Sequence, residues 1–217
     1  MDKALVFLKP DAVLRRYIGA NVIKLFQDDP QIEILTFEEV RINKDLVDAH
    51  YGFLKGRCFY NWLVDYVCSG PVLVTVCRGE DITKHIRNLL GDTICERAPK
   101  ESVRGRYGIY GGVNVVHASD SPQTAVKELY LWNSIYHFNL DEINANKKAS
   151  TYVNRWIKYH VDYTMELREL SFKIAKDHLL KLSLGDKIKS LLREECKEVL
   201  PSDFESFSNV VINNCLL

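Results

Sequence analysis

The sequence predicts an α/β sandwich that is followed by a helical extension at the C-terminus. Short apolar runs that suit buried strands alternate with stretches of helical spacing in the first part of the chain. Glycine and proline then almost disappear, because only one of the 11 glycines and one of the 6 prolines follow Trp132. The chain has 217 residues, 47% of them hydrophobic and 27% charged, and is therefore large enough to bury such a core.

Four segments have the composition of strands. Ala4–Leu8 is continuously apolar and ends at Lys9-Pro10, which predicts a buried strand. Ile32–Val40 is rich in β-branched residues and partly alternating. The apolar runs Val72–Val76 and Val113–Val116 predict the third and fourth strands.

Helical spacing of apolar residues separates these strands. The predicted helices are Gly19–Gln27, Leu46–Leu54, Phe59–Val67, Ile82–Leu90 and one that opens at Ser121-Pro122. Serine suits the cap of that last helix and proline its first position. A glycine-rich loop is expected between residues 90 and 112. This order of elements predicts a ferredoxin-like βαββαβ sandwich with an antiparallel sheet.

The chain after residue 145 is predicted to form amphipathic helices. Apolar residues recur at steps of three and four from Val153 to Ile174 and again from Leu184 to Val199, with a break expected at Gly185-Asp186. Such stripes would favour aggregation if exposed, so we expect the helices to dock. The surface that receives them could belong to this chain, to a neighbouring subunit or to another partner. We therefore divide the chain into a domain of residues 1–145 and an extension of residues 146–217.

Charge and cysteine usage exclude several classes of function. The 29 basic and 29 acidic residues cancel, which gives no field that would attract nucleic acid or a membrane surface. No apolar run is long enough for a membrane span or the core of a signal peptide. The six cysteines lack the spacing of a metal site or a disulfide framework, so we expect a cytoplasmic protein with reduced thiols.

His117 is the main candidate for a reactive residue. It follows the predicted strand Val113–Val116 and precedes the start of a helix, a position at which an anion is favoured. It could act as a nucleophile toward a phosphoryl group, or it could be a structural histidine at the end of a strand. The cations Lys9, Arg87 and Arg104 stand at the ends of elements, and together they suit a triphosphate. Each of them taken alone is more often a solvated surface charge.

The motifs together resemble the nucleoside diphosphate kinase family over residues 3–143. The matching segments are Lys9-Pro-Asp11, His50-Tyr51, Phe59, Ser69-Gly-Pro71, Arg87-Asn-Leu-Leu-Gly-Asp-Thr93, Val103-Arg-Gly105, Asn114-Val-Val-His-Ala-Ser-Asp-Ser121, Glu128 and Trp132. The resemblance implies transfer of the γ-phosphoryl group of a nucleoside triphosphate to a nucleoside diphosphate through a phosphohistidine, in a ping-pong reaction. The alternative is a nucleotide-binding scaffold or regulatory protein that acts through its helical extension.

The resemblance also implies the catalytic residues. His117 would be phosphorylated, Tyr51 and Glu128 would position its ring, and Ser119 would support Glu128. Lys9 is expected to act near the phosphates. A neutral imidazole is available as a nucleophile near pH 7, because its unperturbed pKa is about 6.5.

The residues implied in nucleotide binding are Lys9, Phe59, Arg87, Thr93, Arg104 and Asn114. Lys9 and Asn114 would hold the ribose hydroxyls, the two arginines and Thr93 would bind the phosphates, and Phe59 would stack on the base. Mg²⁺ would arrive on the nucleotide phosphates, without a metal site built from protein residues.

The resemblance further implies a homo-oligomer, with a hexamer favoured. Three positions depart from the family pattern. Arg106 replaces an aspartate, Val113 replaces an arginine, and Gly111 replaces the valine that commonly covers the second face of the base. We therefore expect stacking from one side only, by Phe59.

Overall fold

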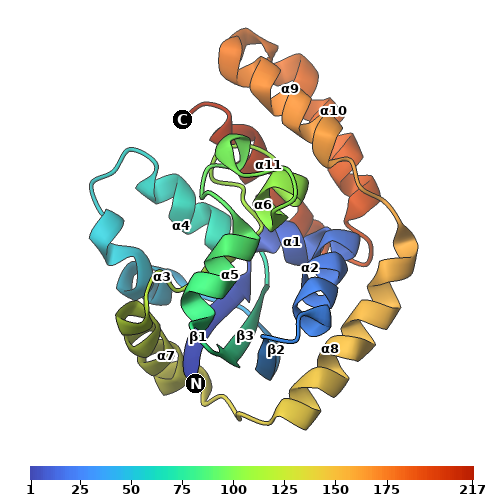
Figure 1. Ribbon diagram of the computed structural model, residues 1–217. Coiled ribbons are helices and arrows are strands. Elements are labelled where there is room, and N and C mark those ends of the chain that lie inside the picture. The colour runs from blue at the N-terminus through green and yellow to red at the C-terminus, as the bar shows by residue number, and fades with distance from the viewer.

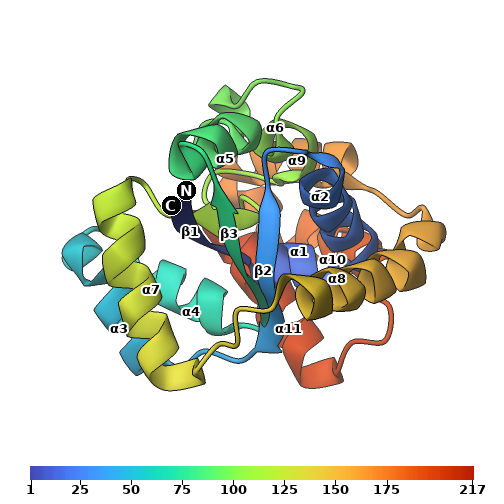
Figure 2. The ribbon, with the colours of Figure 1, turned by 60° about the horizontal axis from the view of Figure 1, so that its bottom comes forward.

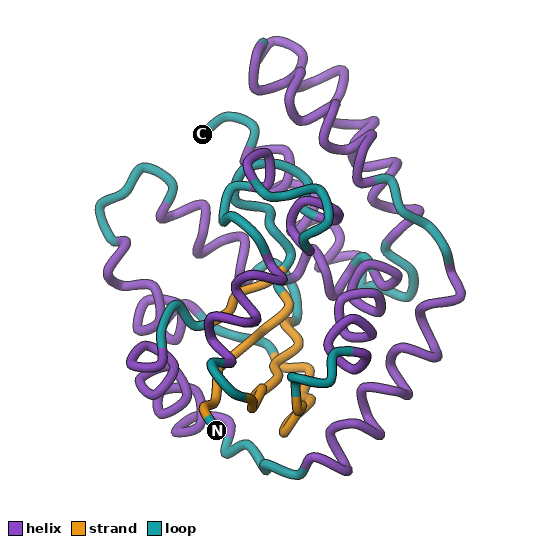
Figure 3. The backbone as a smooth tube through the Cα atoms, in the orientation of Figure 1, coloured by secondary structure: helices purple, strands orange, loops and turns teal.

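The computed structural model describes residues 1–217 and is built around a four-stranded antiparallel sheet of order β2-β3-β1-β4 (Figure 1). The strands are β1 (Asp2–Leu8), β2 (Glu33–Val40), β3 (Val72–Gly79) and β4 (Val116–Ala118). The order and direction of these strands confirm the predicted ferredoxin-like sandwich. Figure 3 shows the strands at the centre and helices around them.

Seven α-helices belong to the first part of the chain. They are α1 (Pro10–Leu14), α2 (Arg16–Asp28), α3 (Lys44–Tyr51), α4 (Tyr60–Cys68), α5 (Ile82–Leu90), α6 (Val103–Tyr107) and α7 (Pro122–Tyr136), with short 3₁₀ turns at Gly52–Leu54 and Cys95–Arg97. Two five-residue helices, α1 and α6, were not predicted, because so short an element has no room for a helical repeat. The helix predicted at Ser121 is α7, whose backbone at Thr124 donates to the Ser121 hydroxyl at 3.1 Å.

Both faces of the sheet are covered. Leu5 and Phe7 of β1 pack in one hydrophobic cluster with α3, α4 and α7, whereas Ala4, Val6 and Leu8 pack in another with α2 and α5. This division follows from the alternation of side chains along a strand. The site described below lies on the side of Phe7.

The fourth strand differs from its prediction. The predicted strand was Val113–Val116, but β4 begins at Val116 and contains His117, which pairs with Phe7 of β1. The physical reason is Val115, whose φ of 75° is incompatible with a strand. Val113 instead closes a tight turn, with its N–H donated to the Tyr110 carbonyl at 2.9 Å. His117 therefore lies within a strand rather than after one.

The C-terminal extension is helical, as predicted. It contains α8 (Glu142–Trp156), α9 (Thr164–Lys176), α10 (Lys181–Glu195) and α11 (Pro201–Asn214), with 3₁₀ turns at Ile157–Tyr159 and His178–Leu180. Figure 1 shows α9 and α10 side by side. The predicted break at Gly185-Asp186 was wrong, because Gly185 is buried inside α10 and faces Ile212 of α11. The break falls instead at Asp177, whose side chain accepts from the backbone of Leu179.

The first helix of the extension packs on the sheet domain. Figure 2 shows α8 beside β2 and α2. Ala145, Ala149 and Val153 of α8 belong to the same buried cluster as Phe26 of α2. The proposed domain division at residue 145 thus falls inside α8, and it stays a prediction.

A buried ion pair joins the end of α10 to the start of α2. Arg15 donates to both carboxylate oxygens of Glu195, at 2.6 and 3.0 Å, and to the hydroxyl of Thr164 at 2.6 Å. Leu167 and Ile188 are fully buried in the cluster that contains Phe7. The extension therefore docks on its own chain. None of the helices combines the length and the apolarity that a membrane span requires.

Candidate active site

A cavity of about 490 Å³ brings the predicted site residues together. It lies at the end of β1 and along β4, and its other walls come from α3, α4, α5, α6, α7 and α11. The predicted residues that line it are Lys9, Tyr51, Phe59, Arg87, Thr93, Arg104, Asn114, His117 and Glu128. Ser119, the tenth, lies behind Glu128 and is fully buried.

The ring of His117 is fixed from two sides. It stacks on Phe7, with 4.8 Å between ring centroids, and its Nε2 lies 3.2 Å from the Glu128 carboxylate. Ser119 donates its hydroxyl to that carboxylate at 2.5 Å and accepts from the Leu5 backbone at 3.2 Å. Glu128 is therefore held in place by a residue anchored to β1.

This arrangement assigns the proton of the neutral imidazole. Because Nε2 faces a carboxylate, the proton belongs on Nε2, and the lone pair belongs to Nδ1. Nδ1 lies 3.3 Å from the Tyr51 hydroxyl, which is a long contact for a hydrogen bond. His117 thus presents an available nitrogen lone pair to the cavity.

Electrostatics keeps that lone pair free of protons. Burial lowers the pKa of His117 to about 3, and the positive charge of Lys9 acts in the same direction. Burial raises the pKa of Glu128 and of the Tyr51 hydroxyl. His117 is therefore neutral at neutral pH and suited to nucleophilic attack.

Two buried cations at the floor of the cavity lack acidic partners. Lys9 donates to the Asn114 side chain at 2.6 Å, and burial lowers its pKa to about 8. Arg104 donates to the carbonyls of Gly91 and Val116 at 3.0 and 2.9 Å, and its Nε is buried with no partner. Burial, reinforced by Arg87, lowers the pKa of Arg104. Removing charges from water without counter-charges is costly, so this floor favours an anion.

Arg87 and Thr93 complete the polar end of the cavity. Arg87 is 39% exposed and pairs with Asp120. Thr93 accepts from the side-chain amide of Asn114 through its backbone carbonyl, at 2.7 Å. The Asn114 amide thus links Lys9 to the loop that carries Thr93.

Asp11 positions this floor, a role that the sequence analysis did not assign. Its carboxylate accepts from the Tyr66 hydroxyl at 2.6 Å and from the Val115 N–H at 2.9 Å. The backbone of Lys9 donates to the Val115 carbonyl at 2.9 Å. These bonds hold Val115 in its left-handed conformation and thereby orient Asn114.

His50 is a second residue without a role assigned from the sequence. With His117 and Glu128 it forms a group whose ligand atoms lie within 4.8 Å of one another, close enough for a metal ion. The indole N–H of Trp132, however, donates to His50 Nδ1 at 3.1 Å. Neutral His50 therefore carries its proton on Nε2, which faces Glu128 at 3.5 Å, and it has no lone pair for a metal there. The Nε2 of His50 lies near Glu128 but makes no hydrogen bond.

The opposite end of the cavity is apolar and includes the extension. Phe59, Trp62 and Leu63 line it, together with Asn214 and Leu217. No pattern near residue 214 marked it as part of a site. The cavity therefore has the polarity of a nucleotide, with cations for phosphates at one end and apolar walls for a base at the other.

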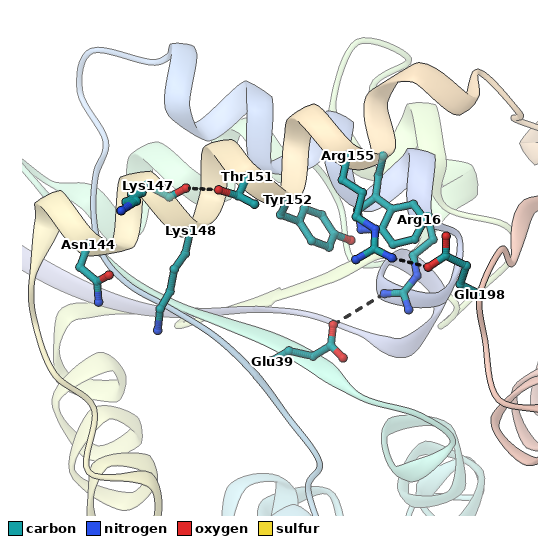
Figure 4. A pocket seen from close by; sticks show the side chains of 10 residues that line it. Arg16, Glu39, Asn144, Lys147, Lys148, Thr151, Tyr152, Arg155 and Glu198 are labelled. Carbon is teal, nitrogen blue, oxygen red and sulfur yellow. Dashed lines mark hydrogen bonds and ion pairs between the residues drawn. The ribbon is translucent and has the colours of Figure 1, made fainter.

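A second hollow lies between α8, β2 and α2 (Figure 4). Its charges largely neutralise one another, because Arg155 pairs with Glu198 and Arg16 lies 3.6 Å from Glu39. Tyr152 lies beside these two ion pairs in Figure 4, and its hydroxyl packs against Gly19 of α2. This hollow offers no group comparable to His117.

Comparison with known proteins agrees with this geometry. The sequence model of the family described as nucleoside diphosphate kinase matches residues 2–137. The nucleoside diphosphate kinase of Herpetosiphon aurantiacus is 33% identical over 157 residues, which are 72% of this chain and 99% of the relative. That of Methanothermobacter thermautotrophicus is 37% identical over 132 residues, which are 61% of this chain and 87% of the relative.

Solved structures show the same similarity. The apo nucleoside diphosphate kinase of Encephalitozoon cuniculi has a TM-score of 0.58 and 32% identity, and the match covers 61% of this chain and 88% of that one. The Halobacterium salinarum enzyme in complex with CDP has a TM-score of 0.57 and 30% identity, and covers 64% of this chain and 91% of that one. The family match ends at residue 137, so the extension from α8 onward lies beyond it. The chain belongs to the nucleoside diphosphate kinase family of enzymes.

Proposed function

We propose that the protein transfers the γ-phosphoryl group of a nucleoside triphosphate to a nucleoside diphosphate through a phosphohistidine at His117. The observation that carries the proposal is the neutral imidazole whose Nδ1 faces a cavity floored by the unpaired cations Lys9 and Arg104. Phosphoryl transfer depends chiefly on positioning and on stabilising the charge that spreads over the phosphate oxygens.

In the first half-reaction, the Nδ1 lone pair attacks the γ-phosphorus. The new P–N bond forms as the bond from the γ-phosphorus to the bridging oxygen breaks, and the electron pair of that bond stays on the departing diphosphate. The imidazole keeps its proton on Nε2, where the Glu128 carboxylate balances the positive charge that the ring acquires. Glu128 is held ready for this by Ser119.

In the second half-reaction, a terminal oxygen of a different nucleoside diphosphate attacks the same phosphorus. The P–N bond breaks and its electron pair returns to Nδ1, which restores the neutral ring. Both nucleotides use one site in turn, so the kinetics are ping-pong. The residues that bind the phosphates are Arg87, Thr93 and Arg104, while Lys9 and Asn114 bind the ribose.

The divalent cation is proposed to be Mg²⁺ carried by the nucleotide phosphates. The acidic residues at the cavity do not form a metal site of their own. Glu128 is engaged by Ser119 and His117, and Asp120 pairs with Arg87. Mg²⁺ prefers oxygen ligands and commonly binds through substrate phosphates. Phosphate oxygens would supply those ligands here.

A coupled assay tests the proposal. ATP is offered with GDP, UDP, CDP or dTDP, and formation of the new triphosphate is followed. His117→Ala is expected to abolish transfer to all four acceptors, because it removes the imidazole that would carry the phosphoryl group. The control is His178→Ala, a change at an exposed histidine of the extension. Transfer by His117→Ala at the rate of His178→Ala would contradict the proposal.

A further inference from the structure

We propose that the C-terminal extension completes the nucleotide site in cis, with Asn214 as the wall that faces the base from the side opposite Phe59. The inference rests on the proposed function for the identity of the ligand. The inference goes beyond the proposed function because it assigns a binding role to a segment that the family match does not include.

Asn214 is a buried and hydrogen-bonded part of the cavity wall. It is 5% exposed, lies in the last turn of α11 and lines the cavity that contains His117. Its side-chain amide donates to the Tyr110 carbonyl at 2.8 Å. This bond ties α11 to the hairpin of residues 110–113 and fixes the plane of the Asn214 amide.

The two glycines of that hairpin make room for Asn214 of the extension and for Trp62 of α4. A Cβ added to Gly111, whose φ is 51°, would lie 3.3 Å from Asn214 Nδ2. A Cβ added to Gly112 would approach the Trp62 ring to 2.8 Å, closer than real Cβ contacts. Asn214 therefore occupies the space into which a side chain at position 111 would project.

A second contact from α11 fixes the same end of the cavity. The Trp62 indole N–H donates to the Val210 carbonyl at 2.8 Å. Leu217 adds an apolar side chain to the lining. The end of the cavity that suits a base is thus lined by Phe59 and Trp62 at the start of α4 and by Asn214 and Leu217 of the C-terminal segment. In this proposal, a clamp on both faces of the base takes the place of the one-sided stacking expected from Gly111.

The clamp is of a kind that tolerates any base. An amide plane and an aliphatic side chain pack on the face of a heterocycle and read none of its edge groups. We therefore expect Asn214 to contribute to the affinity for all nucleotides alike and not to the transfer step.

Two variants of Asn214 distinguish the contribution of its side chain as a wall from the contribution of its hydrogen bond to Tyr110. Asn214→Ala removes both, whereas Asn214→Leu removes the bond but keeps a side chain of similar size. Asn213→Ala is the matched control, because Asn213 is exposed and contacts Lys181. The kcat and KM are measured with GDP, ADP, UDP and CDP, and with the abasic acceptor ribose 5′-diphosphate.

Asn214→Ala is expected to raise KM about tenfold for every nucleoside diphosphate with little change in kcat, as loss of one stacking wall predicts. Asn214→Leu should stay close to the wild type, and ribose 5′-diphosphate should show no difference among the variants. Equal impairment of the Ala and Leu variants, or equal losses with and without a base, would assign Asn214 a structural role and overturn the inference. So would an Asn214→Ala enzyme with the KM values of Asn213→Ala. Failure of the wild-type protein to form a phosphoenzyme would instead overturn the proposed function.

Discussion

The two histidines at the centre of the site are buried without a full counter-charge. Burial lowers the pKa of His117 to about 3 and that of His50 to about 3. Their side chains are 13% and 1% exposed. In an unfolded chain both imidazoles would take up a proton near the ordinary histidine pKa of about 6.5. Between these two pKa values, from about pH 3 to about pH 6.5, the folded protein therefore binds fewer protons than the unfolded chain.

This difference predicts an acid-sensitive fold. The free energy of unfolding falls as pH falls below about 6.5, because the two histidines take up protons in the unfolded state but stay neutral in the folded state. Each histidine should lower the free energy of unfolding by about 2 kcal/mol at pH 5 relative to pH 7. His50→Asn and His117→Asn should each remove about half of the loss that the two residues cause together. The measurement is urea unfolding of the three proteins at a series of pH values.

The control for this prediction is His178→Asn, which changes an exposed histidine in a 3₁₀ turn. It should leave the pH dependence of the wild type unchanged. If His50→Asn and His117→Asn showed the same pH dependence as the control, the two imidazoles would not be buried in the neutral form.

Part of the site could be predicted residue by residue and part could not. The ten predicted residues were found through short motifs, and the structure brings them to one cavity or directly behind it, whereas their roles stay predictions. Asp11 was noticed only as part of a motif, because its bond to Val115 joins residues 104 positions apart. The bond from Asn214 to Tyr110 likewise spans 104 positions. Contacts of that range leave no signal in local spacing.

At the scale of elements, two predictions failed for different physical reasons. The fourth strand was displaced because hydrophobicity does not report the sign of φ, and Val115 adopts a conformation that β-branched residues rarely take. The break at Gly185 was wrong because a glycine can serve close packing inside a helix, here against Ile212. The helix predicted at Ile82–Leu90 has the observed boundaries of α5, whereas the other predicted strands and helices of the sheet domain were found with ends that differ by a few residues.

The ion pair between Arg15 and Glu195 is expected to hold α10 on the sheet domain. Their side chains are 0% and 1% exposed. Glu195→Gln leaves the buried guanidinium with only the partly exposed Asp162, at 3.7 Å, as a counter-charge. Breaking a buried pair costs about 3–5 kcal/mol. Urea unfolding would measure that loss of stability.

A matched control is the pair of Arg155 and Glu198, which are 57% and 52% exposed. Glu198→Gln should cost less than about 1 kcal/mol, because an exposed pair is worth little in water. Equal losses for Glu195→Gln and Glu198→Gln would show that the buried pair does not hold the extension in place.

At the scale of the whole molecule, the extension covers surface that a shorter chain would expose. α8 packs along β2, an edge strand of the sheet, and the Asp141 N–H donates to the Leu35 carbonyl of β2 at 2.9 Å. Part of this edge is thus closed to pairing with another chain. The helical character of the extension could be predicted from its apolar stripes. The surface that it covers could not, because an apolar stripe does not specify the surface against which it packs.

The resemblance to the family predicts a closed homo-oligomer, with a hexamer favoured. Because α8 lies along β2, we expect the subunits to meet through surfaces other than this edge. Sedimentation velocity at micromolar concentration should show a species larger than the 25.0 kDa chain. A monomer under those conditions would contradict the prediction.

The measurement that tests the central claim most directly is the chemical identity of the phosphoenzyme. The protein is incubated with γ-labelled ATP and Mg²⁺ in the absence of a diphosphate, and the labelled residue is located by mass spectrometry. The account predicts one label that is stable to alkali and labile to acid, located on His117, absent from His117→Ala, and discharged by adding GDP. A label on another residue, or transfer from ATP to GDP with no phosphohistidine on His117, would contradict it.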